Sequence, residues 1–160
     1  MELNGEVGSG LNRAHKFMAQ PHYQEQFEEI LGYSAWPGTL NVKVDASDLG
    51  HYVALREASG IDTLNLPEHI RSQAGTTDVS ELEYHRIRPF LRDGKSFGGA
   101  TVFPARIAHI QTPDQHVECA ILVPDLTSHV DVIEVISPKR LRGEFSLSDG
   151  DRVSVITRKL

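Results

Sequence analysis

The chain has 160 residues, of which 39% are hydrophobic, and its formal net charge is −6 at pH 7. This length and hydrophobic content predict one folded domain with a core of its own and exclude a disordered chain. The acidic balance argues against general nucleic-acid binding, and the single cysteine, Cys119, excludes an internal disulfide and a multi-cysteine metal site.

The sequence also lacks the marks of a membrane or exported protein. No apolar run approaches the roughly 18 residues of a membrane-spanning helix, and "MELNGEVGSG" does not resemble a signal peptide. We therefore expect a soluble, cytoplasmic protein. Cys119 lies in the apolar run "VECAILV", which favours a buried structural thiol over a nucleophile.

The first 45 residues predict strands on either side of one helix. Residues 5–19, "GEVGSGLNRAHKFMA", are typical of a short strand, a Gly/Ser turn and a second strand. Residues 21–32, "PHYQEQFEEILG", predict a helix that Pro21 opens and Gly32 ends. A Pro-Gly turn then leads into "LNVKV", residues 40–44, whose alternation predicts a half-buried strand.

Residues 46 to about 94 have weak hydrophobic periodicity and scattered breakers. We interpret this segment as a long insertion with one or two short helices and irregular loops. "SQAGTTDVS", residues 72–80, is the candidate for disorder within it. Long irregular segments in compact domains are often functional or mobile.

Strand patterns follow closely in the next part of the chain. Residues 96–110, "SFGGATVFPARIAHI", predict one or two strands with a break near Pro104. Residues 116–124, "HVECAILVP", and 129–137, "HVDVIEVIS", predict two more, because they are rich in β-branched residues.

The C-terminal residues predict a short helix and a final strand. "PKRLRGEF", residues 138–145, is typical of one or two helical turns with Pro138 at the start. "LSDGDRVSVITRK", residues 147–159, predicts a tight turn and an alternating strand. Many short strands with few helices indicate a mainly β protein, with a closed or nearly closed β-barrel.

Several familiar chemistries lack their sequence motifs. The chain has no G-x-x-x-x-G-K-[ST] phosphate loop and no G-x-S-x-G nucleophile elbow. Its eight histidines are dispersed and include no H-x-x-x-H pair, which argues against a metal site built from histidines.

Thr39 and Asn41 form a candidate metal site. Side chains two apart on a strand point to the same face, so this hydroxyl and this amide project together. Both offer hard oxygen donors of the kind that Mg²⁺ prefers, with substrate phosphates completing its coordination. Spacing alone leaves the alternative open that the two side chains only satisfy a turn and a strand end.

Several runs, taken in order, resemble one known family. "GEVGSGL", "FEEILGYSAWPGTLNVKV", "FGGATVFPARI" and "AILVPDLTSHVDVIEVISPKRLRGEFSLSDGDRV" are similar to the corresponding segments of the archaeal CTP-dependent riboflavin kinases. The resemblance covers roughly residues 5–45 and 94–157. It implies a single domain over residues 1–160, folded as a compact six-stranded Greek-key-type β-barrel of the cradle-loop, riboflavin-kinase-like kind.

The resemblance also implies an activity and its site. The expected reaction transfers the γ-phosphate of CTP to the 5′-hydroxyl of riboflavin, giving FMN and CDP with Mg²⁺, in a monomer or small homo-oligomer. The implied metal ligands are Thr39 and Asn41, and the implied flavin contacts are Thr127 and Glu134. The implied nucleotide contacts are Gly10, Leu11, Asn12, Arg13, Ala14, His15, Lys139, Arg140, Leu141 and Arg142.

Glu134 is the candidate catalytic residue. It shares a predicted strand face with Val132 and Ile136, where a carboxylate is costly unless it has a partner or a ligand. With riboflavin as substrate it would accept hydrogen bonds from ribityl hydroxyls or act as base for the attacking one. The alternative is a solubilising charge on an edge strand.

One turn departs from the family pattern. Asn12 and Ala14 stand where family members carry the later glycines of G-L-G-E-G-R, and alanine adopts left-handed backbone poorly. The departure leaves open a related barrel that binds a flavin or nucleotide as a sensor without transfer. A DNA-binding relative is a third reading, since "LSDGDRVSVI" resembles swapped-hairpin barrels of transcription regulators. The acidic charge and the lack of a helix-turn-helix pattern argue against that reading.

Overall fold

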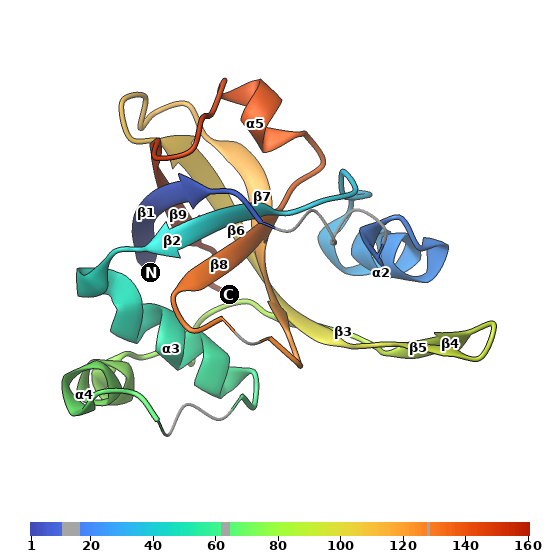
Figure 1. Ribbon diagram of the computed structural model, residues 1–160, viewed down its shortest axis with the longest axis horizontal. Helices are drawn as coiled ribbons and strands as arrows, with labels where there is room; N and C mark the ends of the chain where they lie inside the picture. The colour runs from blue at the N-terminus through green and yellow to red at the C-terminus, as the bar shows by residue number, and fades with distance from the viewer. Residues whose placement is uncertain (11–16, 62–64, 128) are drawn as a thin grey trace.

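The computed structural model of the protein describes residues 1–10, 17–61, 65–127 and 129–160. Within these residues, six strands form a closed antiparallel barrel in the order β6–β7–β8–β2–β1–β9, with β9 pairing back onto β6 (Figure 1). The barrel strands are β1 (Glu2–Gly8), β2 (Leu40–Val44), β6 (Ala100–His109), β7 (Val117–Pro124), β8 (Val132–Ile136) and β9 (Arg152–Thr157). The predicted six-stranded barrel is therefore confirmed.

Alternation along the strands fills the barrel with branched side chains. In β2, Leu40, Val42 and Val44 are buried, whereas Asn41 and Lys43 between them point outward. Phe103 and Ile121 meet the β2 side chains in the same core cluster. Each such large apolar side chain stabilises the fold by about 1.5–3 kcal/mol when fully buried.

Strand β6 runs unbroken through Pro104, so the predicted break there is wrong. Pro104 lies opposite Ala120 of β7, and its carbonyl accepts a hydrogen bond from the backbone N–H of Arg158 on the other side. Its nitrogen therefore also faces away from β7. On that side β6 changes partner, from β3 (His85–Ile87) at residues 100–102 to β9 at residues 105–109. A missing N–H is tolerated at such a change of partner, because no ladder hydrogen bond is lost.

Helix α2 (Pro21–Leu31) lies to the right of the barrel strands in Figure 1 and packs against them. Phe27 packs in a second cluster with Val102, Ala120 and Ile136. Gly32 has a φ of 81° and its N–H bonds to the carbonyl of Glu28, which ends the helix as predicted.

The strand expected before this helix does not extend to its predicted end. Phe17 and Met18 are helical, and Met18 is buried against α2 in the second cluster. The rest of that predicted strand lies outside the described residues.

Residues 46–94 are more regular than predicted. They form a short 3-10 helix, η1 (Ala46–Asp48), helices α3 (Leu49–Ala58) and α4 (Glu68–Thr76), strand β3, and strand β4 (Phe90–Arg92) of a hairpin with β5 (Lys95–Phe97). The disorder expected at residues 72–80 is contradicted, since the first five of these residues belong to α4.

Helix α3 joins this segment to the barrel. Tyr52 and Leu55 belong to the barrel core cluster, whereas Val53 and Ala54 pack on Ile70 of α4. Because α3 buries side chains on several faces, its sequence lacks the single apolar stripe that predicts a helix.

The C-terminal elements follow the prediction, except that the helix begins later than expected. Helix α5 (Leu141–Glu144) begins three residues after Pro138, and Gly150, with a φ of 92°, turns the chain into β9. Cys119 is fully buried and its pKa is raised by burial, as expected of a structural thiol. Among the described helices, none has both the length and the hydropathy needed to cross a membrane.

Candidate active site

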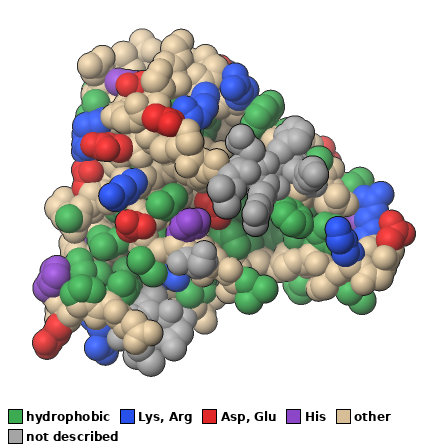
Figure 2. Space-filling view, viewed as in Figure 1, with side chains coloured by type: hydrophobic (Ala, Val, Ile, Leu, Met, Phe, Trp, Pro, Cys, Tyr) green, Lys and Arg blue, Asp and Glu red, His purple; other side chains and the backbone are tan. Residues whose placement is uncertain are grey.

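A cavity of about 1040 Å³ lies against the outer face of β2 and β8. Its walls come from residues 8–10, 36–41, 43, 124, 126–127, 129, 132, 134–135, 137 and 139–142. Figure 2 shows the hollowed middle of this face, with hydrophobic, acidic and histidine side chains around it. Every described residue that the sequence predicted as a metal, flavin or nucleotide contact lines this cavity, although these residues are spread from position 10 to position 142 of the chain.

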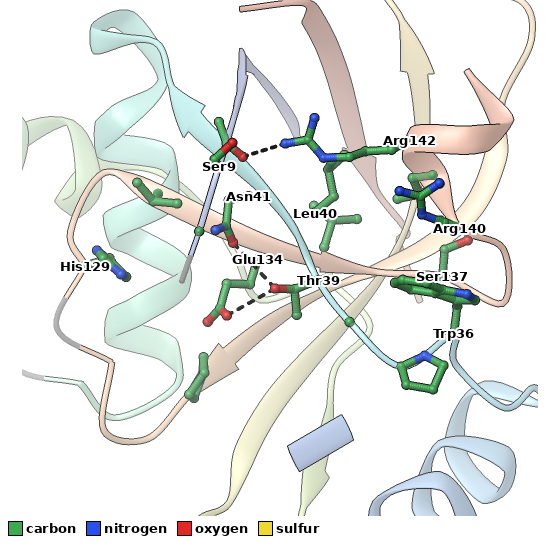
Figure 3. A pocket seen from close by; sticks show the side chains of 18 of the residues that line it. Ser9, Trp36, Thr39, Leu40, Asn41, His129, Glu134, Ser137, Arg140 and Arg142 are labelled. Atoms are coloured by element: carbon green, nitrogen blue, oxygen red, sulfur yellow. Dashed lines mark hydrogen bonds between the residues drawn. The ribbon is translucent and has the colours of Figure 1, made fainter. Parts of the chain in front are cut away.

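Three oxygen-bearing side chains meet at the centre of the cavity (Figure 3). Asn41 of β2 and Glu134 of β8 are direct cross-strand partners, so their side chains emerge together. The Thr39 hydroxyl lies 3.4 Å from Glu134 Oε1 and 3.5 Å from Asn41 Oδ1. Both distances exceed the usual O–H···O hydrogen-bond distance of about 2.7–2.8 Å. The three oxygens therefore lie close together without forming strong hydrogen bonds to one another.

The chemistry of this oxygen cluster fits a hard divalent cation. A hydroxyl, an amide carbonyl and a carboxylate are ligands that Mg²⁺ accepts, and it takes few of them when substrate phosphates supply the rest. The described residues contain no group of three or more His, Cys, Asp or Glu side chains able to hold a metal. A metal bound here would thus depend on Thr39, Asn41 and an incoming phosphate.

Glu134 is a carboxyl in an unusual environment. Burial raises its pKa, while the nearby His129 and the Thr39 hydroxyl act in the opposite direction. A raised pKa makes a carboxylate a stronger base once it is ionised. The residue is therefore suited to accept a proton from a hydroxyl in the cavity.

The N-terminal wall is fixed by a set of polar contacts. Arg142 donates to the carbonyl of Gly8 at 3.1 Å and to Asp149 at 2.7 Å, and the Ser9 hydroxyl donates to Asp149 at 2.5 Å. These contacts bring Gly10 so close that a Cβ there would lie 2.0 Å from Nδ2 of Asn41.

The remainder of the predicted N-terminal turn was expected to grip the nucleotide. It comprises Leu11, Asn12, Arg13, Ala14 and His15, and it lies outside the described residues.

Two further basic residues after β8, Lys139 and Arg140, also line the cavity. Lys139 pairs with Glu144 at 3.2 Å, and the Arg140 guanidinium stacks over the ring of Trp36, 5.8 Å from its centroid. Leu141 is 5% exposed and belongs mainly to the barrel core, although it also lines the cavity.

Trp36 is the largest of the lining side chains that the sequence did not predict. Its backbone N–H bonds to the carbonyl of Ser137, and its side chain remains 40% exposed. A large aromatic residue directly before a Pro-Gly turn was the available signal.

Thr127 lies in the connection between β7 and β8. Its backbone N–H bonds to the carbonyl of Pro124, and its hydroxyl accepts a hydrogen bond from the N–H of His129 at 3.3 Å. Thr127, His129 and Glu134 line the same cavity. In Figure 3, His129 lies on one side of Glu134, and Trp36 and Arg140 lie on the other.

Comparison with known proteins gives one consistent family. The model of the CTP-dependent riboflavin kinase family (CTP-dep_RFKase, described as a domain of unknown function, DUF120) matches residues 7–62 and 60–156.

Curated relatives named riboflavin kinase are similar over almost the whole chain. The one from Thermoplasma acidophilum is 34% identical over 153 residues, covering 96% of this chain and 56% of the relative. Those from Haloquadratum walsbyi and Thermofilum pendens are 33% and 35% identical, covering 97% and 98% of this chain and 56% and 58% of the relatives. The chain thus spans a little over half the length of the curated relatives it matches.

Proposed function

The chain belongs to the CTP-dependent riboflavin kinase family, and from this premise we propose that it phosphorylates riboflavin. The proposed donor is CTP and the products are FMN and CDP. The observation that carries the proposal is the cluster of Thr39, Asn41 and Glu134, which shares one cavity with exposed cationic side chains. Phosphoryl transfer needs such positioning and charge neutralisation more than it needs covalent chemistry.

In this proposal Thr39 and Asn41 hold Mg²⁺ through their side-chain oxygens. When bound, the ion neutralises charge on the phosphate oxygens of the donor. Further positive charge, where the nucleotide is proposed to bind, comes from Lys139, Arg140 and Arg142, which line the cavity.

Glu134 acts on the acceptor. The 5′-oxygen of riboflavin attacks the γ-phosphorus, the bond from that phosphorus to the β–γ bridging oxygen breaks, and CDP leaves with the electron pair. Glu134 accepts the proton that the attacking hydroxyl loses. Thr127, on the same wall, is the proposed partner of the flavin.

The experiment is an assay of the purified protein with riboflavin, Mg²⁺ and each of ATP, GTP, UTP and CTP in turn. FMN is measured by chromatography, with chelator and with Asn41→Ala as controls. We expect FMN with CTP above the other donors. Equal rates with all four donors would contradict the CTP preference, and riboflavin binding without FMN from any donor would contradict a kinase.

A binding module is the second candidate, and the observation in its favour is the altered N-terminal turn. Asn12 and Ala14 replace glycines of the family pattern, which is expected to weaken nucleotide binding. Titration calorimetry distinguishes the two functions, because a sensor would bind riboflavin or nucleotide with no turnover when both are present.

A further inference from the structure

The connection between β7 and β8, described at residues 125–127 and 129–131, forms one wall of the cavity and carries Thr127 and His129. Among its described residues, the backbone hydrogen bonds that join it to other elements lie near its two ends. Asp125 N–H bonds to the carbonyl of Gly99, and Val44 N–H bonds to the carbonyl of Asp131. Such a connection needs side-chain support if it is to present Thr127 in a fixed position.

Arg86 of β3 supports the first end. Its two terminal nitrogens bond to the two carboxylate oxygens of Asp125 at 2.7 and 2.8 Å, and one also donates to Thr101 at 3.0 Å. Hydrogen bonding to Arg86 lowers the pKa of Asp125. The pair fits closely against Gly99, where a Cβ would lie 2.9 Å from Asp125 Oδ2 and 3.0 Å from the arginine.

Arg56 of α3 supports the other end. It donates a hydrogen bond to the carbonyl of His129 and stacks on Tyr52, 5.9 Å from the ring centroid. Arg56 is only 3% exposed, and no ion pair between described residues includes it. Burying a guanidinium costs desolvation free energy. This cost has a physical reason if the role of Arg56 is to hold the carbonyl of His129 in place.

Both arginines belong to residues 46–94, the segment predicted as an insertion. The β7–β8 connection runs between α3 and β3 in Figure 1, and Arg56 and Arg86 bond to its residues 129 and 125, respectively. We propose that Arg56 and Arg86 are positioning residues, which clamp the β7–β8 connection and thereby set the affinity for riboflavin. The choice of riboflavin as the affected substrate rests on the proposed function.

The test compares Arg56→Lys, Arg86→Gln, Asp125→Asn and the double variant Arg86→Gln/Asp125→Asn. Arg71→Gln, an exposed arginine on α4 in the same segment, is the matched control. Hydrogen–deuterium exchange follows the peptide that contains the connection, and flavin fluorescence gives the dissociation constant of riboflavin. Where turnover is present, the KM values for riboflavin and CTP are measured separately.

In each of the four variants we expect faster exchange in the connection than in the wild type. Riboflavin binding should weaken by about fivefold or more, as for the loss of one charge-assisted hydrogen bond. The KM for CTP should change less than about twofold, within the noise of a surface substitution. The double variant should show the same exchange rate and the same riboflavin affinity as either single variant, because Arg86 and Asp125 act as one pair.

Unchanged exchange in the connection, or parallel increases in both KM values, would overturn the proposal. Arg86 and Asp125 are 46% and 36% exposed, so their variants should fold even if Arg56→Lys does not. Should the wild-type protein make no FMN with any donor, the proposed function fails, and the exchange and riboflavin-binding measurements still decide the role of the clamp.

Discussion

Asn41 and Glu134 are opposite one another in the β2–β8 ladder, with the Thr39 hydroxyl within 3.5 Å of an oxygen of each. The ladder therefore fixes the spacing between the proposed metal ligands and the proposed base. Because a shift of one residue would turn one of them into the barrel core, the register itself maintains the site.

Thr39→Ala and Asn41→Ala should each lower kcat/KM for FMN formation by about 100-fold or more, since each removes a proposed ligand of the ion that neutralises phosphate charge. Melting temperatures should stay close to the wild-type value, because both side chains lie outside the barrel core. Asn65→Ala, at an exposed position, is the control. Near-normal turnover in both site variants would rule out the metal assignment.

Glu134→Gln should lower kcat by about 100- to 10,000-fold if the carboxylate is the general base. In the wild type, kcat/KM should fall as the pH drops through the raised pKa of Glu134, above the ordinary value near 4.5. That acidic limb should be absent from the residual activity of the variant. An identical pH profile in both proteins would assign Glu134 a structural role only.

The same substitution should change stability in a pH-dependent way. Burial raises the Glu134 pKa in the folded state, so ionisation of this carboxyl opposes folding as the pH rises through that raised value. Glu134→Gln should therefore be more stable than the wild type at pH 7, and the difference should shrink below the ordinary pKa. Urea unfolding at several pH values measures it, and a larger gain in acid would contradict the burial argument.

Gly10→Ala should impair turnover by about 10- to 100-fold, the scale of a displaced catalytic group. The added Cβ would lie 2.0 Å from Nδ2 of Asn41 and would move the flexible amide rather than the backbone. Stability should change little for the same reason. Gly75→Ala on α4, where a Cβ meets open space, is the matched control, and equal kinetics in the two variants would show that Asn41 is not held at this position.

Trp36→Ala should raise the KM for CTP by about 5- to 100-fold, the range expected when one stacking surface for a base is removed. Trp36→Phe should restore part of the affinity, and Tyr84→Ala, an exposed aromatic residue outside the cavity, should have no effect. Trp36 is the only tryptophan in the sequence, so its fluorescence reports nucleotide binding directly. A signal that responds to riboflavin but not to CTP would reassign this wall to the flavin.

The sequence predicted correctly those helices and strands that are determined by residues close to them in the chain. Helix α2 has Pro21 at its start and Gly32 at its end, and β2 alternates between core and cavity, so neither depends on distant residues. The outward placement of Asn41 follows from the same alternation. Its pairing with Glu134 does not, because strand order is decided by long-range packing.

The remaining features depend on neighbours that the sequence does not identify. Pro104 usually signals a break, and only the change of partner from β3 to β9 allows β6 to continue. Lys139 reads as a free cation in the sequence, yet its ammonium group is paired with Glu144. Arg56 gave no signal at all, since the contact that explains it lies 73 residues away in the chain.

The pairing of β1 with β9 has a consequence for how the protein folds. Residues 2–6 hydrogen-bond to residues 152–156, so the wall of the barrel is complete only when the earliest and latest strands of the described chain have met. Contacts of such long sequence separation slow folding to about the millisecond-to-second range seen for other barrels. During synthesis, the edge of β1 that pairs with β9 would stay unpaired until β9 has been made. An unpaired strand edge promotes aggregation, so the nascent chain is more prone to aggregate than the folded barrel.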